Sequence, residues 1–169
     1  MSLIKVRSSD LQAAYNRSAD DYISFLVNEM MDNIGGKLNY EAMSKLNSDQ
    51  ITLLAYSILH EEVMDGGFVQ LIYNGYGPFL FFNPFAKALA NWGLEDLSKM
   101  IKKGGKLYGK HRKEIEHECS DEEFMAMFER FPDFDNLDDD FIENEEQWTN
   151  EIAFYINNNI CHFVELEDE

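Results

Sequence analysis

The chain has 169 residues, of which 45% are hydrophobic and 14% aromatic, enough for one hydrophobic core and too apolar for a disordered protein. Its formal net charge is −18, from 32 acidic and 14 basic residues, which argues against direct binding of nucleic acid or of an anionic membrane. The longest apolar run, residues 78–82, is too short to span a bilayer, and no secretory signal opens the chain, so we expect a cytoplasmic protein.

The acidic excess is confined to the last third of the chain. Residues 1–113 carry 12 acids and 13 bases, whereas residues 114–169 carry 20 acids and a single base, Arg130. Such a one-sided field repels polyanions and speeds the encounter with basic molecules. A basic protein is therefore the expected partner.

Apolar residues recur at helical spacing along most of the chain, and capping residues precede several of these stretches. Residues 1–17 are expected to form an N-terminal arm that starts as a loose segment or a short strand. The helices predicted after this arm cover residues 18–34, 40–46, 48–65, 85–92, 94–103, 106–117, 121–131 and 146–163. The pairs Gly66-Gly67 and Gly104-Gly105 are interpreted as helix ends, with one or two further turns after the first pair. Residues 165–169 are expected to be a frayed acidic tail.

No stretch alternates apolar and polar residues over a length that would support a sheet, and no internal repeat is present. The sequence therefore predicts an all-α fold. We expect a single domain over residues 18–164, built as an irregular bundle of about eight to ten helices.

Acids are densest between residues 133 and 146, where the sequence predicts an acidic loop and a short helix, with Asn144 and Gln147 capping the last helix. Helical positions three and four apart rise about 4.5–6 Å, so rows of carboxylates there approximate a DNA strand, which carries one charge per roughly 3.4 Å. The alternative is a solvated face with acids at helix starts. The candidate partner-binding acids are Asp133, Asp135, Asp138, Asp139, Asp140, Glu143, Glu145 and Glu146.

The segment from Glu62 to Asn74 reads Glu-Val-Met-Asp-Gly-Gly-Phe-Val-Gln-Leu-Ile-Tyr-Asn and resembles the signature of the DNA-mimic protein domain family. That signature has a Glu, then Asn-Gly-Gly-Phe, a Gln two residues later, an aromatic pair and an Asn. Here Asp65 stands in place of the first Asn, and Leu71-Ile72 in place of the aromatic pair. The matching residues are Glu62, Gly66, Gly67, Phe68, Gln70 and Asn74.

A second block, Phe131-Pro132 followed by Leu-Asp-Asp-Asp-Phe at 137–141, is also similar to this family, so the resemblance runs over residues 48–163. It implies an all-helical fold, a homodimer, and an acidic surface that occupies the DNA-binding face of a transcription regulator. It implies no catalytic residue and no cofactor.

The Gly-Gly-Phe segment has a structural interpretation of its own. Gly66 and Gly67 permit a positive φ at a helix end. Gln70 and Asn74 lie one helical turn apart and are expected to bond the backbone groups that this break frees. An architectural role is therefore the preferred interpretation of the segment.

Motifs for metal binding and nucleophilic catalysis are incomplete. The single Glu-x-x-His at 114–117 has no second copy, residues 133–144 fail the calcium-loop pattern, and His60-Glu61-Glu62 lacks the second His of a zinc helix. Cys119 and Cys161 are interpreted as buried free thiols. We therefore expect no metal, no cofactor and no enzymatic activity.

Two further groups of side chains stand out. One is a basic run, interpreted as a solvated helix face or as a partner for acids within the chain or its dimer: Lys99, Lys102, Lys103, Lys106, Lys110, Arg112 and Lys113. The other is an aromatic segment that we expect to be largely buried, in the core or at a dimer interface: Tyr73, Tyr76, Phe79, Phe81, Phe82 and Phe85.

The leading hypothesis is an acidic regulatory protein that mimics DNA and blocks the DNA-binding face of a basic partner. The alternatives are a helical adaptor that binds a basic protein without copying DNA, and an enzyme of unrecognised type.

Overall fold

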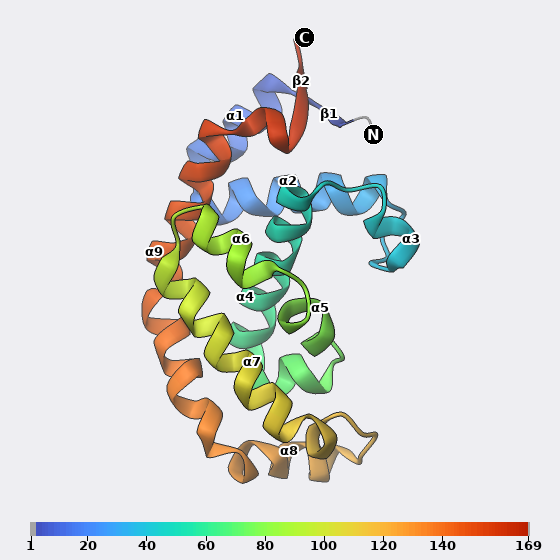
Figure 1. Ribbon diagram of the computed structural model, residues 1–169. Helices are drawn as coiled ribbons and strands as arrows, with labels where there is room; N and C mark the ends of the chain where they lie inside the picture. The colour runs from blue at the N-terminus through green and yellow to red at the C-terminus, as the bar shows by residue number, and fades with distance from the viewer. Residues whose placement is uncertain (1–2, 169) are drawn as a thin grey trace. The chain divides into compact units, whose positions relative to one another are not determined.

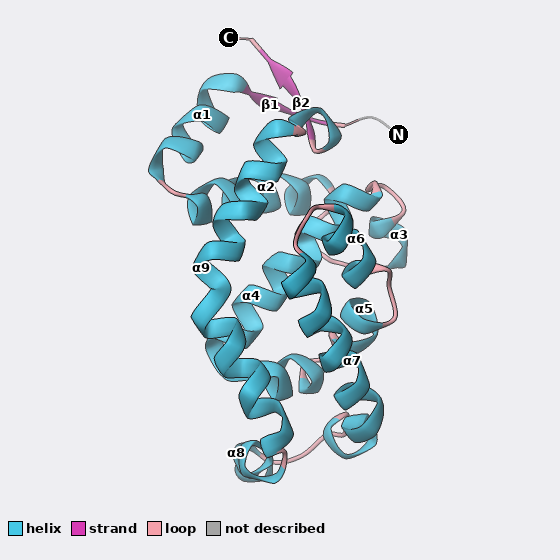
Figure 2. Cartoon of the chain, turned by 60° about the vertical axis from the view of Figure 1, so that its left-hand side comes forward, coloured by secondary structure: helices cyan, strands magenta, loops and turns pink. Residues whose placement is uncertain are grey.

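The structure is a computed structural model that describes residues 3–168. Within this range the chain forms nine α-helices and one pair of short strands, which confirms the predicted all-helical class (Figures 1 and 2). The contacts fall into two compact units, Met1–Ser57 with Gln147–Glu169, and Ile58–Glu146. Two long helices contribute to both units: α4, Ser48–Tyr73, and α9, Asp135–Asn158.

The first unit brings the two ends of the described chain together. Strand β1, Ile4–Arg7, pairs in parallel with β2, Val164–Glu167. Helix α1, Ser8–Arg17, follows β1 directly and packs against α2, Ala19–Asn33. The N-terminal residues thus form a strand and a packed helix, and the tail that we expected to fray contributes a strand. Strands of four residues are too short for an alternating pattern to reveal them.

Capping residues set the start of the early helices. The Ser18 Oγ accepts a hydrogen bond of 3.0 Å from the Asp21 backbone N–H, so α2 begins where the sequence predicts. The Asn39 Oδ1 caps the short helix α3, Tyr40–Met43, in the same way.

The second unit holds the middle of the chain. It contains the last part of α4, the first part of α9, and the elements between them: α5, Gly77–Phe81; α6, Phe85–Asn91; α7, Glu95–Ile115; α8, Asp121–Arg130; and the 3₁₀ turn η1, Pro132–Phe134. No helix in the described range is both long and apolar enough to cross a membrane.

The break predicted at Gly104-Gly105 is wrong, because both glycines lie inside the continuous helix α7. A Cβ added at Gly104 would lie 3.0 Å from the Cε1 of Phe81, and one added at Gly105 would lie 3.6 Å from its Cδ1. The glycines therefore let the Phe81 ring of α5 approach the axis of α7, and close packing rather than a turn accounts for them.

The loop and short helix predicted over 133–146 are also wrong. Only η1 precedes α9, which runs without interruption from Asp135 and includes Asn144 and Gln147, the residues interpreted as a cap. Its buried side chains include Leu137, Phe141, Trp148 and Ile152, which recur at helical spacing. Burial of this stripe outweighs the low helix propensity of the Asp and Asn residues around it.

The aromatic segment is only partly buried. Phe85 is 3% exposed, but Phe82 is 64% exposed, so Phe82 lies outside the core of this chain and its burial at a dimer interface stays a prediction. The remaining members are half-buried: Tyr73, Tyr76, Phe79 and Phe81. Both cysteines are free thiols, and Cys161 is exposed rather than buried.

Candidate partner-binding surface

The candidate acids lie close to a kink in α4, where a carboxylate from α9 takes part in the fold. Gly67 has φ 79° and ψ −177°, a backbone region open essentially to glycine alone, and it splits α4 into two helical parts. The second part starts at Phe68, whose backbone N–H donates a hydrogen bond of 2.8 Å to the Asp138 Oδ1. Asp138 thus caps a helix N-terminus, where a carboxylate also meets the positive end of the helix dipole.

Asp138 is turned inward rather than toward solvent. Burial raises the pKa of its carboxyl group to about 6, and the negative charges of Asp135 and Asp139 add to the rise, while the hydrogen bond from Phe68 lowers it. A group that is half-buried and bonded within the fold is poorly placed to meet a partner. Its role in this structure is to hold the kink of α4 against α9.

The remaining residues of the Gly-Gly-Phe segment complete the kink. The Glu62 Oε2 accepts hydrogen bonds from the Gln70 Nε2 at 3.0 Å and from the Asn74 Nδ2 at 2.9 Å. The two amides therefore bond a carboxylate across the kink, not the freed backbone groups that we expected. Gln70 also donates to the Asp65 Oδ2 at 2.9 Å, and its side chain lies where a Cβ on Gly66 would be.

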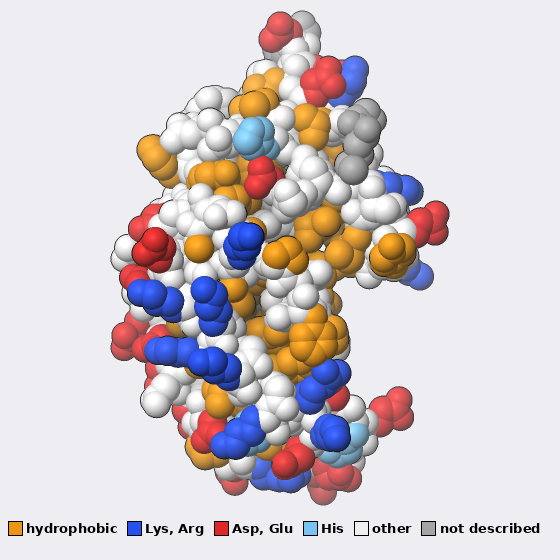
Figure 3. Space-filling view, in the orientation of Figure 1, with side chains coloured by type: hydrophobic (Ala, Val, Ile, Leu, Met, Phe, Trp, Pro, Cys, Tyr) orange, Lys and Arg blue, Asp and Glu red, His pale blue; other side chains and the backbone are white. Residues whose placement is uncertain are grey.

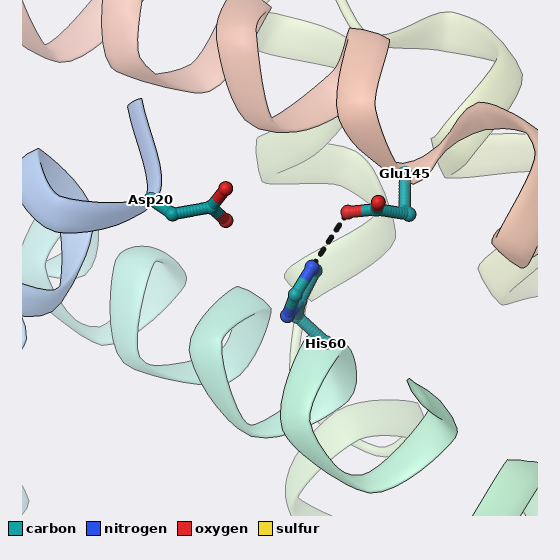
Figure 4. A group of neighbouring side chains, drawn as sticks. All are labelled: Asp20, His60 and Glu145. Carbon is teal, nitrogen blue, oxygen red and sulfur yellow. Dashed lines mark hydrogen bonds and ion pairs between the residues drawn. The ribbon is translucent and has the colours of Figure 1, made fainter. Parts of the chain in front are cut away.

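Two more of the eight candidate acids have partners inside the second unit. The Glu145 Oε2 lies 2.7 Å from the His60 Nε2 of α4 (Figure 4). The Asp133 Oδ2 lies 3.0 Å from the His111 Nε2 and 3.4 Å from the Lys110 Nζ of α7. The bond with His111, followed by that with Lys110, lowers the pKa of Asp133.

Five candidate acids are exposed on the first half of α9: Asp135, Asp139, Asp140, Glu143 and Glu146. None of their carboxylates has an ion pair within residues 3–168, and the hydrogen bond from the Asn144 Nδ2 to Asp140 goes to its backbone oxygen. We call these five residues the acidic row. At 100° per residue, four of its members share one face of α9, and Asp140 lies beside them. The row spans about 16 Å of helix, so it carries one charge per roughly 3–4 Å, close to the roughly 3.4 Å of one DNA strand.

An apolar side chain lies within this row. Ile142 is 50% exposed and occupies the position three residues after Asp139 and four before Glu146, on the same face. The sequence contained the signal for it, since Ile142 falls off the buried stripe of Leu137 and Phe141 once the segment is treated as helical. The histidine partners of Glu145 and Asp133 lie 85 and 22 residues away and leave no such signal.

Comparison with known proteins identifies the family of this chain. The sequence model of the DMP19-like proteins matches residues 44–159, a range that includes both the kink in α4 and the acidic row. The chain belongs to the DMP19-like protein family. One relative in this family is the protein named DNA mimic protein DMP19 of Neisseria meningitidis serogroup B. It is 37% identical over 127 residues, which is 75% of this chain and 77% of that protein.

Membership in the DMP19-like family confirms the resemblance found from the Gly-Gly-Phe segment. In the structure, the glycines and amides of this segment lie at the kink that Asp138 caps. The two departures from the family signature fall at Asp65, which still accepts a hydrogen bond, and at Leu71-Ile72, which is fully buried.

Proposed function

We propose that the protein mimics DNA and blocks the DNA-binding face of a basic partner such as a transcription regulator. The acidic row is the observation that carries the proposal, because it is exposed, without bases of its own, and charged at nearly the density of a DNA strand. The name of the relative from Neisseria meningitidis supports the same activity.

The negative charge of the acidic row has no ion-pair partner among the described residues. Like charges three and four residues apart destabilise a helix slightly, so a row of five acids on α9 adds nothing to the stability of the free protein. A partner with a basic DNA-binding face relieves this repulsion and is attracted from a distance. The side chains of Asp138 and Glu145, which the fold already uses, are left out of the proposed contact.

The proposal has three further parts. The protein acts by binding and not by catalysis. It works in the cytoplasm, where DNA-binding proteins are found. It forms a homodimer, which would present two acidic rows to a partner that is itself symmetric.

The test is capture followed by competition. The protein is immobilised, incubated with a lysate of the organism that makes it, washed with buffer, and then treated with duplex DNA. We expect a DNA-binding protein to be retained, and to be released by duplex DNA that contains its site. Retention should be lost in the variant Asp139→Asn, Asp140→Asn, Glu143→Gln, which neutralises three members of the acidic row.

A matched variant controls for net charge. Asp32, Glu41 and Asp168 are exposed and lie in the first unit. Asp32→Asn, Glu41→Gln, Asp168→Asn removes the same three charges, and it should retain the partner. If both variants lose the partner equally, net charge and not the row is responsible. If the captured protein holds its DNA while bound, the chain is an adaptor and the mimicry is wrong.

A further inference from the structure

A groove opens on the second unit where the connection between α5 and α6 crosses α7. Its volume is about 440 Å³, within the range of pockets that hold a ligand or a buried side chain. Its apolar lining includes Leu80, Phe81, Ala86 and Ile101. Gly105 of α7 also lines the groove and has no side chain to fill it. The groove is therefore largely apolar, and its volume is sufficient for an aromatic side chain.

An aromatic ring is held exposed at the rim of this groove. Phe82 is 64% exposed, and the Arg112 guanidinium carbon lies 5.2 Å from its ring centre. The same guanidinium lies 4.9 Å from the ring centre of Tyr108, and the Arg112 Nε donates a hydrogen bond of 2.8 Å to the Glu116 Oε1. Tyr108 donates a second hydrogen bond to that oxygen. The Arg112 guanidinium that contacts Phe82 is therefore held in place by Glu116 and Tyr108.

The other rim is basic. Lys102 and Lys106 line the groove, one helical turn apart, and Lys99 and Lys103 continue the same side of α7. All four are exposed, and none has an ion pair within the described range of 3–168. Figure 3 shows Lys and Arg side chains gathered over α7 beside an exposed hydrophobic patch. A cluster of free cations is unexpected in a chain of net charge −18.

We propose that this groove is a second interaction site, which binds an acidic segment of a protein partner. An aromatic side chain of that segment enters the apolar groove against Phe82, and carboxylates on either side of it meet Lys99, Lys102, Lys103 and Lys106. The proposal is independent of the acidic row, because it uses α5, α6 and α7 and carries the opposite charge. One surface of the second unit thus takes a basic partner and the other an acidic one.

The occupant follows from the shape and charge of the site. The four lysines extend over eight residues of α7, about 10 Å from first to last, which suits an extended peptide better than a small anion. A nucleic acid strand is the poorer fit, since its many phosphates would meet the net charge of the whole chain, whereas a short peptide places few charges near it. One aromatic anchor in a pocket with a charged rim is the usual arrangement of a binding hot spot.

The test uses a defined probe, a fluorescein-labelled peptide of sequence Asp-Glu-Asp-Trp-Glu-Asp-Glu with blocked ends, titrated against the full chain and followed by polarisation. We expect saturable binding that weakens about tenfold when Trp becomes Ser, and about tenfold in Phe82→Ala or in Lys102→Glu, Lys106→Glu. Backbone amide shifts in a ¹⁵N spectrum should localise to residues 80–86 and 99–106.

The matched control is Lys37→Glu, Lys45→Glu, which reverses the same two charges at exposed lysines of the first unit. It should bind the peptide as the unaltered protein does. The proposal is overturned by absence of saturable binding, by equal binding of the Ser peptide, or by equal loss in the control. It is also overturned if an oligo-dT of twelve nucleotides binds the groove more tightly than the peptide does. A change in sedimentation of Lys102→Glu, Lys106→Glu would identify a second copy as the occupant and would equally overturn it.

Discussion

The Asp138 carboxylate on α9 accepts a hydrogen bond of 2.8 Å from the Phe68 backbone N–H on α4, although 70 residues separate them. The bond lies beside Gly67, where a Cβ would be only 2.5 Å from the Asp138 Oδ2. A backbone kink, a glycine and a buried acid therefore depend on one another. Asp138 therefore contributes to the fold, although it lies in the most acidic part of the chain.

The titration of Asp138 should be visible in the pH dependence of stability. Its folded-state pKa is raised to about 6 from the ordinary 3.8, so the folded protein holds this proton more tightly than the unfolded chain. The contribution to the free energy of unfolding is complete below about pH 4 and is lost as the pH rises through 6. Asp138→Asn keeps an acceptor for Phe68 and should abolish this loss.

Urea unfolding of both proteins at pH 4.5, 5.5 and 7 measures the effect as a difference between them. Asp138→Ala is the control for the hydrogen bond, because it leaves the Phe68 N–H unpaired and should cost about 1–3 kcal/mol at every pH. An Asn variant that follows the same pH curve as the unaltered protein would show that Asp138 titrates normally.

Gly67→Ala should be strongly destabilising, by at least about 2 kcal/mol, because the backbone conformation excludes a side chain and the new Cβ meets Asp138. Gly93→Ala provides a comparison, since Gly93 also has a positive φ but has open space around it. It should cost about 1 kcal/mol, from backbone strain alone. If Gly67→Ala and Gly93→Ala lowered the free energy of unfolding equally, as measured by thermal unfolding, the contact of the new Cβ with Asp138 would have no effect.

Glu62→Gln tests the amide contacts across the kink. The Glu62 carboxylate accepts from both Gln70 and Asn74, and charge-assisted bonds of this kind are about twice as strong as neutral ones. We expect a loss of about 1–2 kcal/mol in urea unfolding. Glu61→Gln, at the exposed neighbouring position, should change stability by less than about 0.5 kcal/mol. A null effect at Glu62 would mean that the glycines and Asp138 maintain the kink without these amide contacts.

The sequence predicts helices well where the buried residues form a single periodic stripe. It predicts them poorly where packing against distant residues determines whether a helix continues. The helices at Ser18 and Ser120 begin at their predicted caps, because a cap is local chemistry. Gly104-Gly105 looks like a helix break until Phe81 lies against it. The acidic segment looks like a loop because its Asp residues outweigh Leu137 and Phe141 in any local reading.

The candidate partner-binding surface shows the same difference between what local sequence predicts and what distant contacts decide. The density of acids predicts the region of the candidate surface, and the five members of the acidic row are exposed. Which acids the fold uses depends on His60, His111 and Phe68, whose contacts with α9 or η1 arise only on folding. Charge pattern therefore predicts the region, and tertiary contacts select its members.

Gly109→Ala should stabilise the protein, by about 0.5–1 kcal/mol, since Gly109 is exposed inside α7 and a Cβ there meets nothing within 4 Å. Gly104→Ala gains the same helix propensity but pushes against Phe81 at 3.0 Å, and should give no gain or a net loss. Thermal unfolding of the two variants separates these effects. Stabilisation of equal size would show that the Phe81 contact is loose.

The acidic row and Ile142 should act on different steps of binding to the partner captured in the competition experiment. Exposed charges steer the encounter over about 8–10 Å at 0.1–0.15 M salt, so Asp139→Asn, Asp140→Asn, Glu143→Gln should lower the association rate about tenfold at low salt. The difference should shrink as salt increases. We expect Ile142, 50% exposed among these acids, to make an apolar contact only after docking, so Ile142→Ser should mainly speed dissociation.

Surface plasmon resonance at several salt concentrations resolves the two rates. Met125→Ser is the control, because Met125 is an exposed apolar residue of α8 outside the row, at 66% exposure, and neither rate should change. Phosphates offer no apolar group, so a partner that depended on charge alone would not distinguish Ile142 from Ser. Dissociation unaffected by Ile142→Ser would therefore mean that the partner reads the row purely as a substitute for a DNA strand, with no contact specific to this protein at its centre.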